Sequence, residues 1–201
     1  MKNSLLLFVS LLSGFSIMAI EISAAKLFEP KLGTSITLWS AVIAFTMLGL
    51  ALGYLFGVRV NSLTKSKLYI PLLLACLYTF ITPAIFELVV GLMGESSHKM
   101  TILICCFVTL VPNFLFLGTV SPMLIGIINE KVQTSGASSG MIFSISTVGG
   151  IVSTLFFGLY YLPYVGISAS FKMIAVCLLI SALFAMLFQS KKSDPLTANK
   201  H

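Results

Sequence analysis

Charged residues divide this sequence into a series of long uncharged segments rich in Leu, Ile, Val, Phe, Ala, Gly and Ser. The segments lie at 3–20, 32–58, 68–86, 100–129, 132–171 and 173–190. A helix needs roughly 20 mostly apolar residues to cross a bilayer. The 40-residue segment is too long for one crossing, and Pro163 and Gly166 mark the place where it divides. The pattern predicts six transmembrane helices, at about 4–25, 34–58, 68–93, 100–128, 138–162 and 166–190.

The composition supports a membrane protein. Hydrophobic residues make up 58% of the chain and charged residues only 9%, whereas a soluble domain has roughly 25% charged residues. We therefore expect an all-α, polytopic membrane bundle over residues 1–190, surrounded by the lipid bilayer, and a short polar cytoplasmic tail at 191–201. The 12 Lys and Arg residues are spread over many loops, so they form no basic patch and exclude a nucleic-acid partner.

The positive charges also predict an orientation. Eight of them lie on the side of the N-terminus and four on the other side, and the richer side is normally cytoplasmic. Both termini are therefore expected in the cytoplasm. We interpret the first segment as a span rather than a cleaved signal peptide, because Glu21 interrupts the region just before Ser23-Ala24-Ala25.

Two ridges of small residues predict close helix packing. Small residues at every fourth position let the backbones of membrane helices approach each other. The ridges are Gly49, Gly53 and Gly57 in the second span, and Ser146, Gly150, Thr154 and Gly158 in the fifth. They fit packing within one bundle, with a homodimer face as the alternative. A shift of 101 residues superposes the two ridges, which indicates either an inverted repeat of three plus three spans or a coincidence of common glycines.

Two carboxylates in apolar surroundings, Glu21 and Glu87, are the candidate substrate or ion site. An ionisable group inside a membrane is costly and therefore suggests function. If their helices are neighbours, the pair could receive a cation such as an amine, or could carry protons. The alternative is that both lie at the outer interface, where Lys26 or Lys31 neutralises Glu21.

The fourth span contains Pro112 and Pro122, which we expect to break or kink it. Backbone carbonyls freed there could line a cavity, although kinks also occur in inert spans. The sequence contains no phosphate-binding or nucleotide-binding motif and no His or Cys pair at ligand spacing. We therefore expect no metal, no cofactor and no autonomous active site.

Four segments in order resemble one family. They are SGFSIMAIEISAAKL with Glu21, FTMLGLALGYLFGVR with Arg59, LGTVSP with Pro122, and SGMIFSISTVGGIVSTLFFGLYYLPYVG with Pro163. They are similar to the membrane region of bacterial fused major-facilitator/spermidine-synthase-like proteins, also called membrane spermidine-synthase-like proteins. The resemblance covers about residues 5–188. It implies a half-major-facilitator-like bundle in the bacterial inner membrane and a role connected with polyamines.

The sequence departs from that family in two ways. The family continues into a cytoplasmic aminopropyltransferase-like domain, whereas this sequence stops after the sixth span, and the family's acidic–basic pair after the second span is Ser62-Leu63 here. The leading hypothesis is therefore a membrane subunit that anchors or supplies a separate aminopropyltransferase-like or methyltransferase-like enzyme. Its contacts would be the positive residues Arg59, Lys65 and Lys67, the segment 130–136 and the tail.

Two alternatives to this hypothesis remain. One is a small transporter of amines or other cations that works as a dimer of six-span units and uses Glu21 and Glu87. The other is an assembly protein without a ligand, in which only substitutions on the glycine ridges would have an effect.

Overall fold

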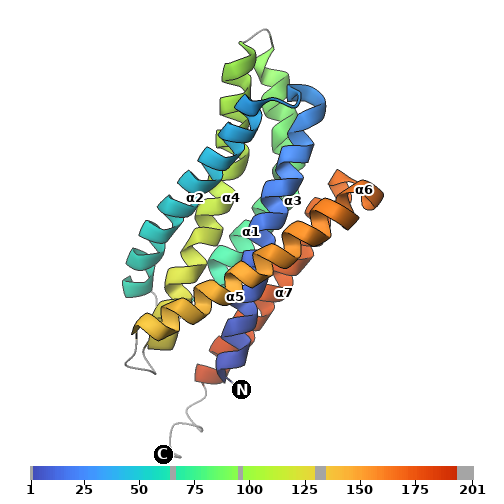
Figure 1. Cartoon of the computed structure of the whole chain (residues 1–201). Helices are drawn as coiled ribbons and strands as arrows, with labels where there is room; N and C mark the ends of the chain where they lie inside the picture. Colours follow the sequence, from blue (N-terminus) through green and yellow to red (C-terminus); the bar gives the residue numbers. More distant parts are fainter. Residues whose placement is uncertain (1, 64–66, 95–96, 130–134, 194–201) are drawn as a thin grey trace, which may run out of the picture.

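The structure is a computed structural model that describes residues 2–63, 67–94, 97–129 and 135–193, and every regular element in those ranges is helical. Within these ranges six helical segments are long and apolar enough to cross a membrane, which confirms the expected number of spans. The termini of the described chain lie at the same end of the bundle (Figure 1). The elements are α1 (Lys2–Leu32), α2 (Ile36–Leu63), α3 (Tyr69–Met93), α4 (His98–Asn129), α5 (Ser135–Leu155), η1 (Phe156–Tyr161), α6 (Leu162–Val165) and α7 (Ile167–Ser193).

The first helix is longer than predicted. α1 continues to Leu32 instead of ending near residue 25, and it ends at Gly33, whose φ of +69° is a conformation that favours glycine. The extra turns are charged, and within them the Lys26 ammonium lies 2.9 Å from a Glu29 carboxylate oxygen. A hydrophobicity pattern marks only the apolar part of a helix, so it misses a continuation that is stabilised by charged side chains.

The fifth span is one helical stretch, Ser139–Val165, close to the predicted 138–162, but the type of helix changes along it. After Leu155 the backbone widens into one π-helical segment, η1, and then returns to the short α6. Gly166, with φ of +92°, makes the turn into α7, which confirms the predicted division of the longest uncharged segment. Single π-helical turns of this kind are rare and often lie next to functional sites.

Two groups of three helices show the same packing pattern. In the first group α2 and α3 pack on α4, and in the second α5 and α7 pack on α1. The contacts between α1 and α4 and between α3 and α7 join the two groups. α1 and α4 run in opposite directions through the bundle (Figure 1). The contact pattern is therefore the one expected of an inverted repeat in which α1, α2 and α3 correspond to α4, α5 and α7.

Glycines at the two crossings fix the register of this repeat. A Cβ added to Gly53 would lie 2.7 Å from Gly118 Cα, and one added to Gly118 would lie 2.8 Å from Leu50 O. In the other half, Gly14 meets the backbone of Ser146, and Gly149 meets the backbone three residues before Gly14. Gly14 thus corresponds to Gly118, and Gly149 to Gly53.

The predicted shift of 101 residues is wrong. It pairs Gly53 with Thr154, whereas the contacts pair Gly53 with Gly149. Gly49 and Gly57 do pack against α4, and Gly150 packs against Met18 of α1. Gly158, at the end of the fifth-span ridge, has no atom within 4 Å of its added Cβ. The fifth-span ridge is therefore a packing surface only in its first half.

Both prolines of the fourth span lie inside the continuous helix α4, so the expected break does not occur. A proline cannot donate to the carbonyl four residues earlier, which for Pro112 is the carbonyl of Val108. The Tyr78 hydroxyl of α3 donates to this oxygen, and the buried Asn113 and Thr79 side chains form a hydrogen bond 3.1 Å long beside it. The carbonyl freed by Pro112 is thus used in helix packing and does not line a cavity.

Candidate binding groove

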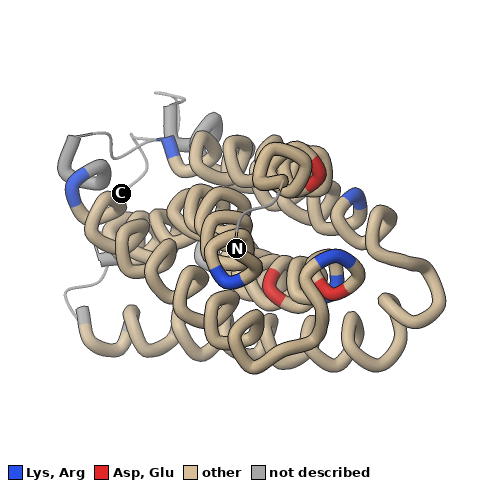
Figure 2. Tube along the Cα trace, turned by 90° about the horizontal axis from the view of Figure 1, so that it is seen from above, with Lys and Arg blue, Asp and Glu red and all other residues tan. Residues whose placement is uncertain are grey.

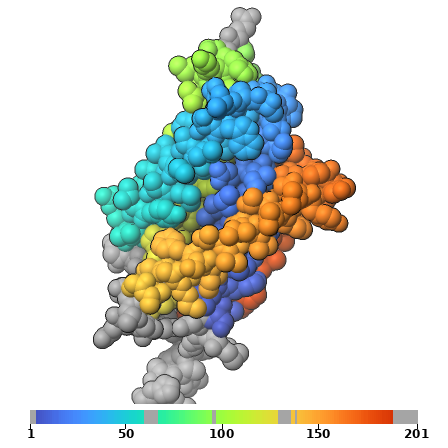
Figure 3. Space-filling model, viewed as in Figure 1, coloured from blue at the N-terminus to red at the C-terminus, as the bar shows by residue number. Residues whose placement is uncertain are grey.

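A hollow lies between α2 and α5, which make their extensive contacts with α4 and α1 respectively. Figure 3 shows α1 and α4 at the bottom of this hollow, between the cyan α2 and the orange α5. Its cavity measures about 460 Å³, a size that suits an organic molecule of moderate dimensions. We call this cavity the α2–α5 groove. Its lining residues are Gly14, Ile17, Met18, Leu50, Tyr54, Ser121, Phe143, Ser146, Thr147, Gly150, Ile151, Thr154 and Leu155.

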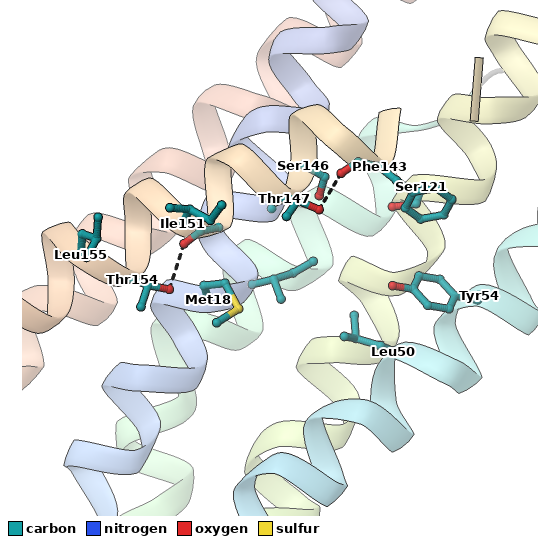
Figure 4. Close-up of a pocket in the computed structure, with 13 residues that line it drawn as sticks. Met18, Leu50, Tyr54, Ser121, Phe143, Ser146, Thr147, Ile151, Thr154 and Leu155 are labelled. Atoms are coloured by element: carbon teal, nitrogen blue, oxygen red, sulfur yellow. Dashed lines mark hydrogen bonds between the residues drawn. The ribbon is translucent and has the colours of Figure 1, made fainter. Parts of the chain in front are cut away.

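The α2–α5 groove is apolar with a few hydroxyl groups. Thr147 and Thr154 donate their hydroxyl protons to carbonyls of their own helix, at 2.8 and 2.9 Å. The hydroxyls of Tyr54 and Ser121, from α2 and α4, lie on the same side of the groove (Figure 4). These groups could orient a bound molecule by hydrogen bonds, while the apolar walls would contact its hydrocarbon part.

Glu21 lies one helical turn beyond this groove. Met18 on α1 and Leu50 on α2 line the groove, and Glu21 and Thr46 follow them on the same two helices, toward the α1–α2 turn. The Thr46 hydroxyl lies 3.5 Å from a Glu21 carboxylate oxygen but 2.9 Å from the carbonyl of Ile43. At these distances the threonine proton goes to the carbonyl, so Glu21 receives only a weak contact.

The neighbouring lysines do not neutralise Glu21, contrary to the interfacial alternative. Within the described residues, Lys26 pairs with Glu29 and Lys31 pairs with Glu87, and no ion pair includes Glu21. The side chain of Glu21 is partly buried among the helices. A carboxylate without a cation in this position is costly, so it is the residue in the membrane that most needs a positively charged partner.

The structure separates the two candidate carboxylates. Glu87 is bound to Lys31, which lies ten residues after Glu21 on the same helix, a rise of about 15 Å. The side chain of Glu87 is also 57% exposed. The two carboxylates therefore do not form one cation site, and Glu21 is the one that lies near the groove. Figure 2 shows how few charged residues interrupt the uncharged trace of the bundle.

The predicted cytoplasmic contact residues are only partly visible. Arg59 is exposed near the end of α2, and Lys67 borders a small hollow between α2, α3 and α4 of about 260 Å³. Lys65, the segment 130–134 and the tail after Ser193 lie outside the described residues. The three positive residues are therefore not shown to form one surface.

Sequence reasoning missed Gly14, Gly118 and Gly149, although they form the two crossings. None of them belongs to the two rows of small residues spaced by four that the sequence shows, so only their contacts reveal their role. Tyr54 and Ser121 were missed for the same reason, because no spacing rule places residues from α2 and α4 in one groove.

Comparisons with protein-family models, with curated proteins and with solved structures find no match for this chain. The similarity to membrane spermidine-synthase-like proteins therefore stays a prediction. The function is inferred below from the inverted repeat, the α2–α5 groove and Glu21.

Proposed function

We propose that this chain binds a lipophilic organic cation, such as an aromatic amine, in the α2–α5 groove and moves it across the membrane. The observation that carries this proposal is the carboxylate of Glu21, which lies one helical turn beyond an apolar groove and has no ion-pair partner among the described residues. The charged group of the bound cation would pair with the Glu21 carboxylate. The hydrocarbon part of the cation would fill the space beside Met18 and Leu50. A polyamine fits less well, because the lining of the groove contains no carboxylate and Glu21 beside it could pair with only one ammonium group.

The inverted repeat supports transport over binding alone. In many transporters substrates bind at the interface between two inverted repeats, and movement of one repeat relative to the other exposes the site to alternate sides. The α2–α5 groove has this location, since its walls come from α1 and α2 of one repeat and α4 and α5 of the other. Two copies facing each other through the grooves would enclose the site, as the predicted dimer requires.

The test is uptake of ethidium, a rigid aromatic cation, into proteoliposomes with an imposed membrane potential. Glu21→Gln removes the counter-charge and keeps the size of the side chain, so we expect the initial rate to fall about tenfold or more. Glu87→Gln is the matched control, because it removes a carboxylate that already has a lysine partner outside the groove. Equal rates in the wild type and the Glu21→Gln variant, with equal melting temperatures, contradict the proposal.

The second candidate is the membrane subunit for a separate transferase, in the bacterial inner membrane with cytoplasmic termini. Its support is the family resemblance and the exposure of Arg59 and Lys67. Purification in mild detergent through a C-terminal tag tests it directly. A soluble transferase present in equal amounts favours the subunit role, whereas its absence together with ethidium uptake favours transport.

A further inference from the structure

A separate groove lies on the opposite pair of helices, between α3 and α7. The helices run antiparallel there, and the Cys76 thiol lies 3.1 Å from the carbonyl oxygen of Ala175. The cavity measures about 490 Å³ and is bordered by apolar side chains, with Lys172 among them. None of its lining residues borders the α2–α5 groove. We call it the α3–α7 groove, and its outer side faces lipid.

Lys172 is a charged residue in an otherwise apolar groove. It lies within the apolar span Ile167–Phe188, about 7.5 Å from the start of α7, and its side chain is exposed. The ion pairs within the described residues leave it out, and the carboxylates of Glu29 and Glu87 are bound to other lysines. An ammonium group on the lipid-facing surface is costly unless it reaches the interface or meets an anion.

The shape of the α3–α7 groove indicates which anion fits. Lys172 of α7 and Phe80 of α3 lie at one end of the groove. Leu179, seven residues after Lys172, and Leu73, seven residues before Phe80, lie about 10 Å away. The groove thus begins with a cation near the α6–α7 turn and continues as an apolar trough toward the other side of the membrane. A molecule with a phosphate head and a hydrocarbon chain matches both ends at once.

We propose that the α3–α7 groove is a binding site for an anionic phospholipid, with its phosphate at Lys172 and one acyl chain along Phe80, Val176 and Leu179. The Lys172 ammonium supplies the charge, and the apolar trough supplies the contact area that distinguishes a bound lipid from bulk lipid. This site is independent of cation transport, because it uses other helices and the opposite charge.

Native mass spectrometry of the full chain with phosphatidylglycerol and phosphatidylcholine measures the preference for the anionic lipid. We expect the wild type to retain phosphatidylglycerol, and Lys172→Gln to reduce the preference about fivefold. Lys99→Gln is the control, because it removes the same charge from another exposed lysine that does not border the groove. Val176→Trp fills the trough and should weaken binding of both lipids while the anionic preference stays.

Two outcomes overturn the proposal. One is a Lys172→Gln variant that keeps the wild-type preference for phosphatidylglycerol. The other is a Lys99→Gln variant that loses as much of the preference as Lys172→Gln, because the effect would then come from net charge and not from the groove. A melting temperature equal to that of the wild type shows that each variant is folded.

Discussion

The two equivalent helix pairs, α2 with α4 and α5 with α1, use glycine differently. α2 lies along α4, and three glycines spaced by four residues, Gly49, Gly53 and Gly57, rest against its backbone over about 12 Å. α5 packs on α1 from Ile142, whose carbonyl accepts the Ser10 hydroxyl, to Gly150 beside Met18, and then continues through η1 toward α6 (Figure 1). The α2–α4 pair therefore packs through a regular row of three glycines, whereas the α1–α5 pair packs through Gly149 and Gly150 and leaves Gly158 without a contact. The α2–α5 groove lies between these two pairs.

The largest loss of stability is expected where α2 packs against α4 without free space. Gly53→Leu would push a branched side chain into the backbone of Leu115 and Gly118, so the free energy of unfolding should fall by about 3 kcal/mol or more. Thermal unfolding in detergent measures the loss. Gly91→Leu in α3 is the control, since a Cβ there meets nothing within 4 Å. Equal stability of the two variants would show that α2 and α4 are not in contact as described.

A smaller effect is expected at the crossing of α1 and α5. Gly149→Ala places a methyl group 2.2 Å from the backbone carbonyl oxygen of Leu11 and 3.1 Å from the backbone nitrogen of Phe15, so we expect a loss of about 2–3 kcal/mol in the free energy of unfolding. Gly150→Ala is a close comparison, because its methyl group meets mainly the flexible Met18 side chain, which can move. If Gly150→Ala is the more damaging variant in thermal unfolding, the register assigned to this crossing is wrong.

The smallest change in stability is expected at Gly158, in the π-helical segment that follows α5. Gly158→Ala adds a methyl group to open space in η1, so the free energy of unfolding should change by less than about 0.5 kcal/mol. Thermal unfolding beside Gly149→Ala gives the comparison. A loss as large as that of Gly149→Ala would mean that α5 packs along α1 over its full length, and the two halves would then be alike.

The number of spans and the turn at Gly166 could be predicted from the sequence, because hydrophobicity and chain-reversing residues act locally. The ridge at Gly49, Gly53 and Gly57 was also a sound prediction of a packing surface. The charged end of α1 was missed, since the Lys26–Glu29 pair looks like a loop in a hydropathy pattern.

The register of the repeat could not be predicted from the sequence. Glycines spaced by four residues can be superposed in several registers, and the shift that matched most of them was not the one that the contacts use. The candidate site had the same difficulty. Glu21 was predicted from its charge alone, but its separation from Glu87 depends on Lys31, whose partner could not be known before the helices were placed.

The position of Glu21 along its helix has an electrical consequence. It lies eleven residues before the end of α1 and nineteen after its start, or about 17 and 28 Å along the axis. A cation that travels from one surface to Glu21 and then to the other surface would cross two unequal parts of the membrane voltage. The full crossing is worth about 2.3 kcal/mol per charge at 100 mV. The step between Glu21 and the end that carries the termini would take the larger share, so a current limited by that step would depend more steeply on voltage than one limited by the other step.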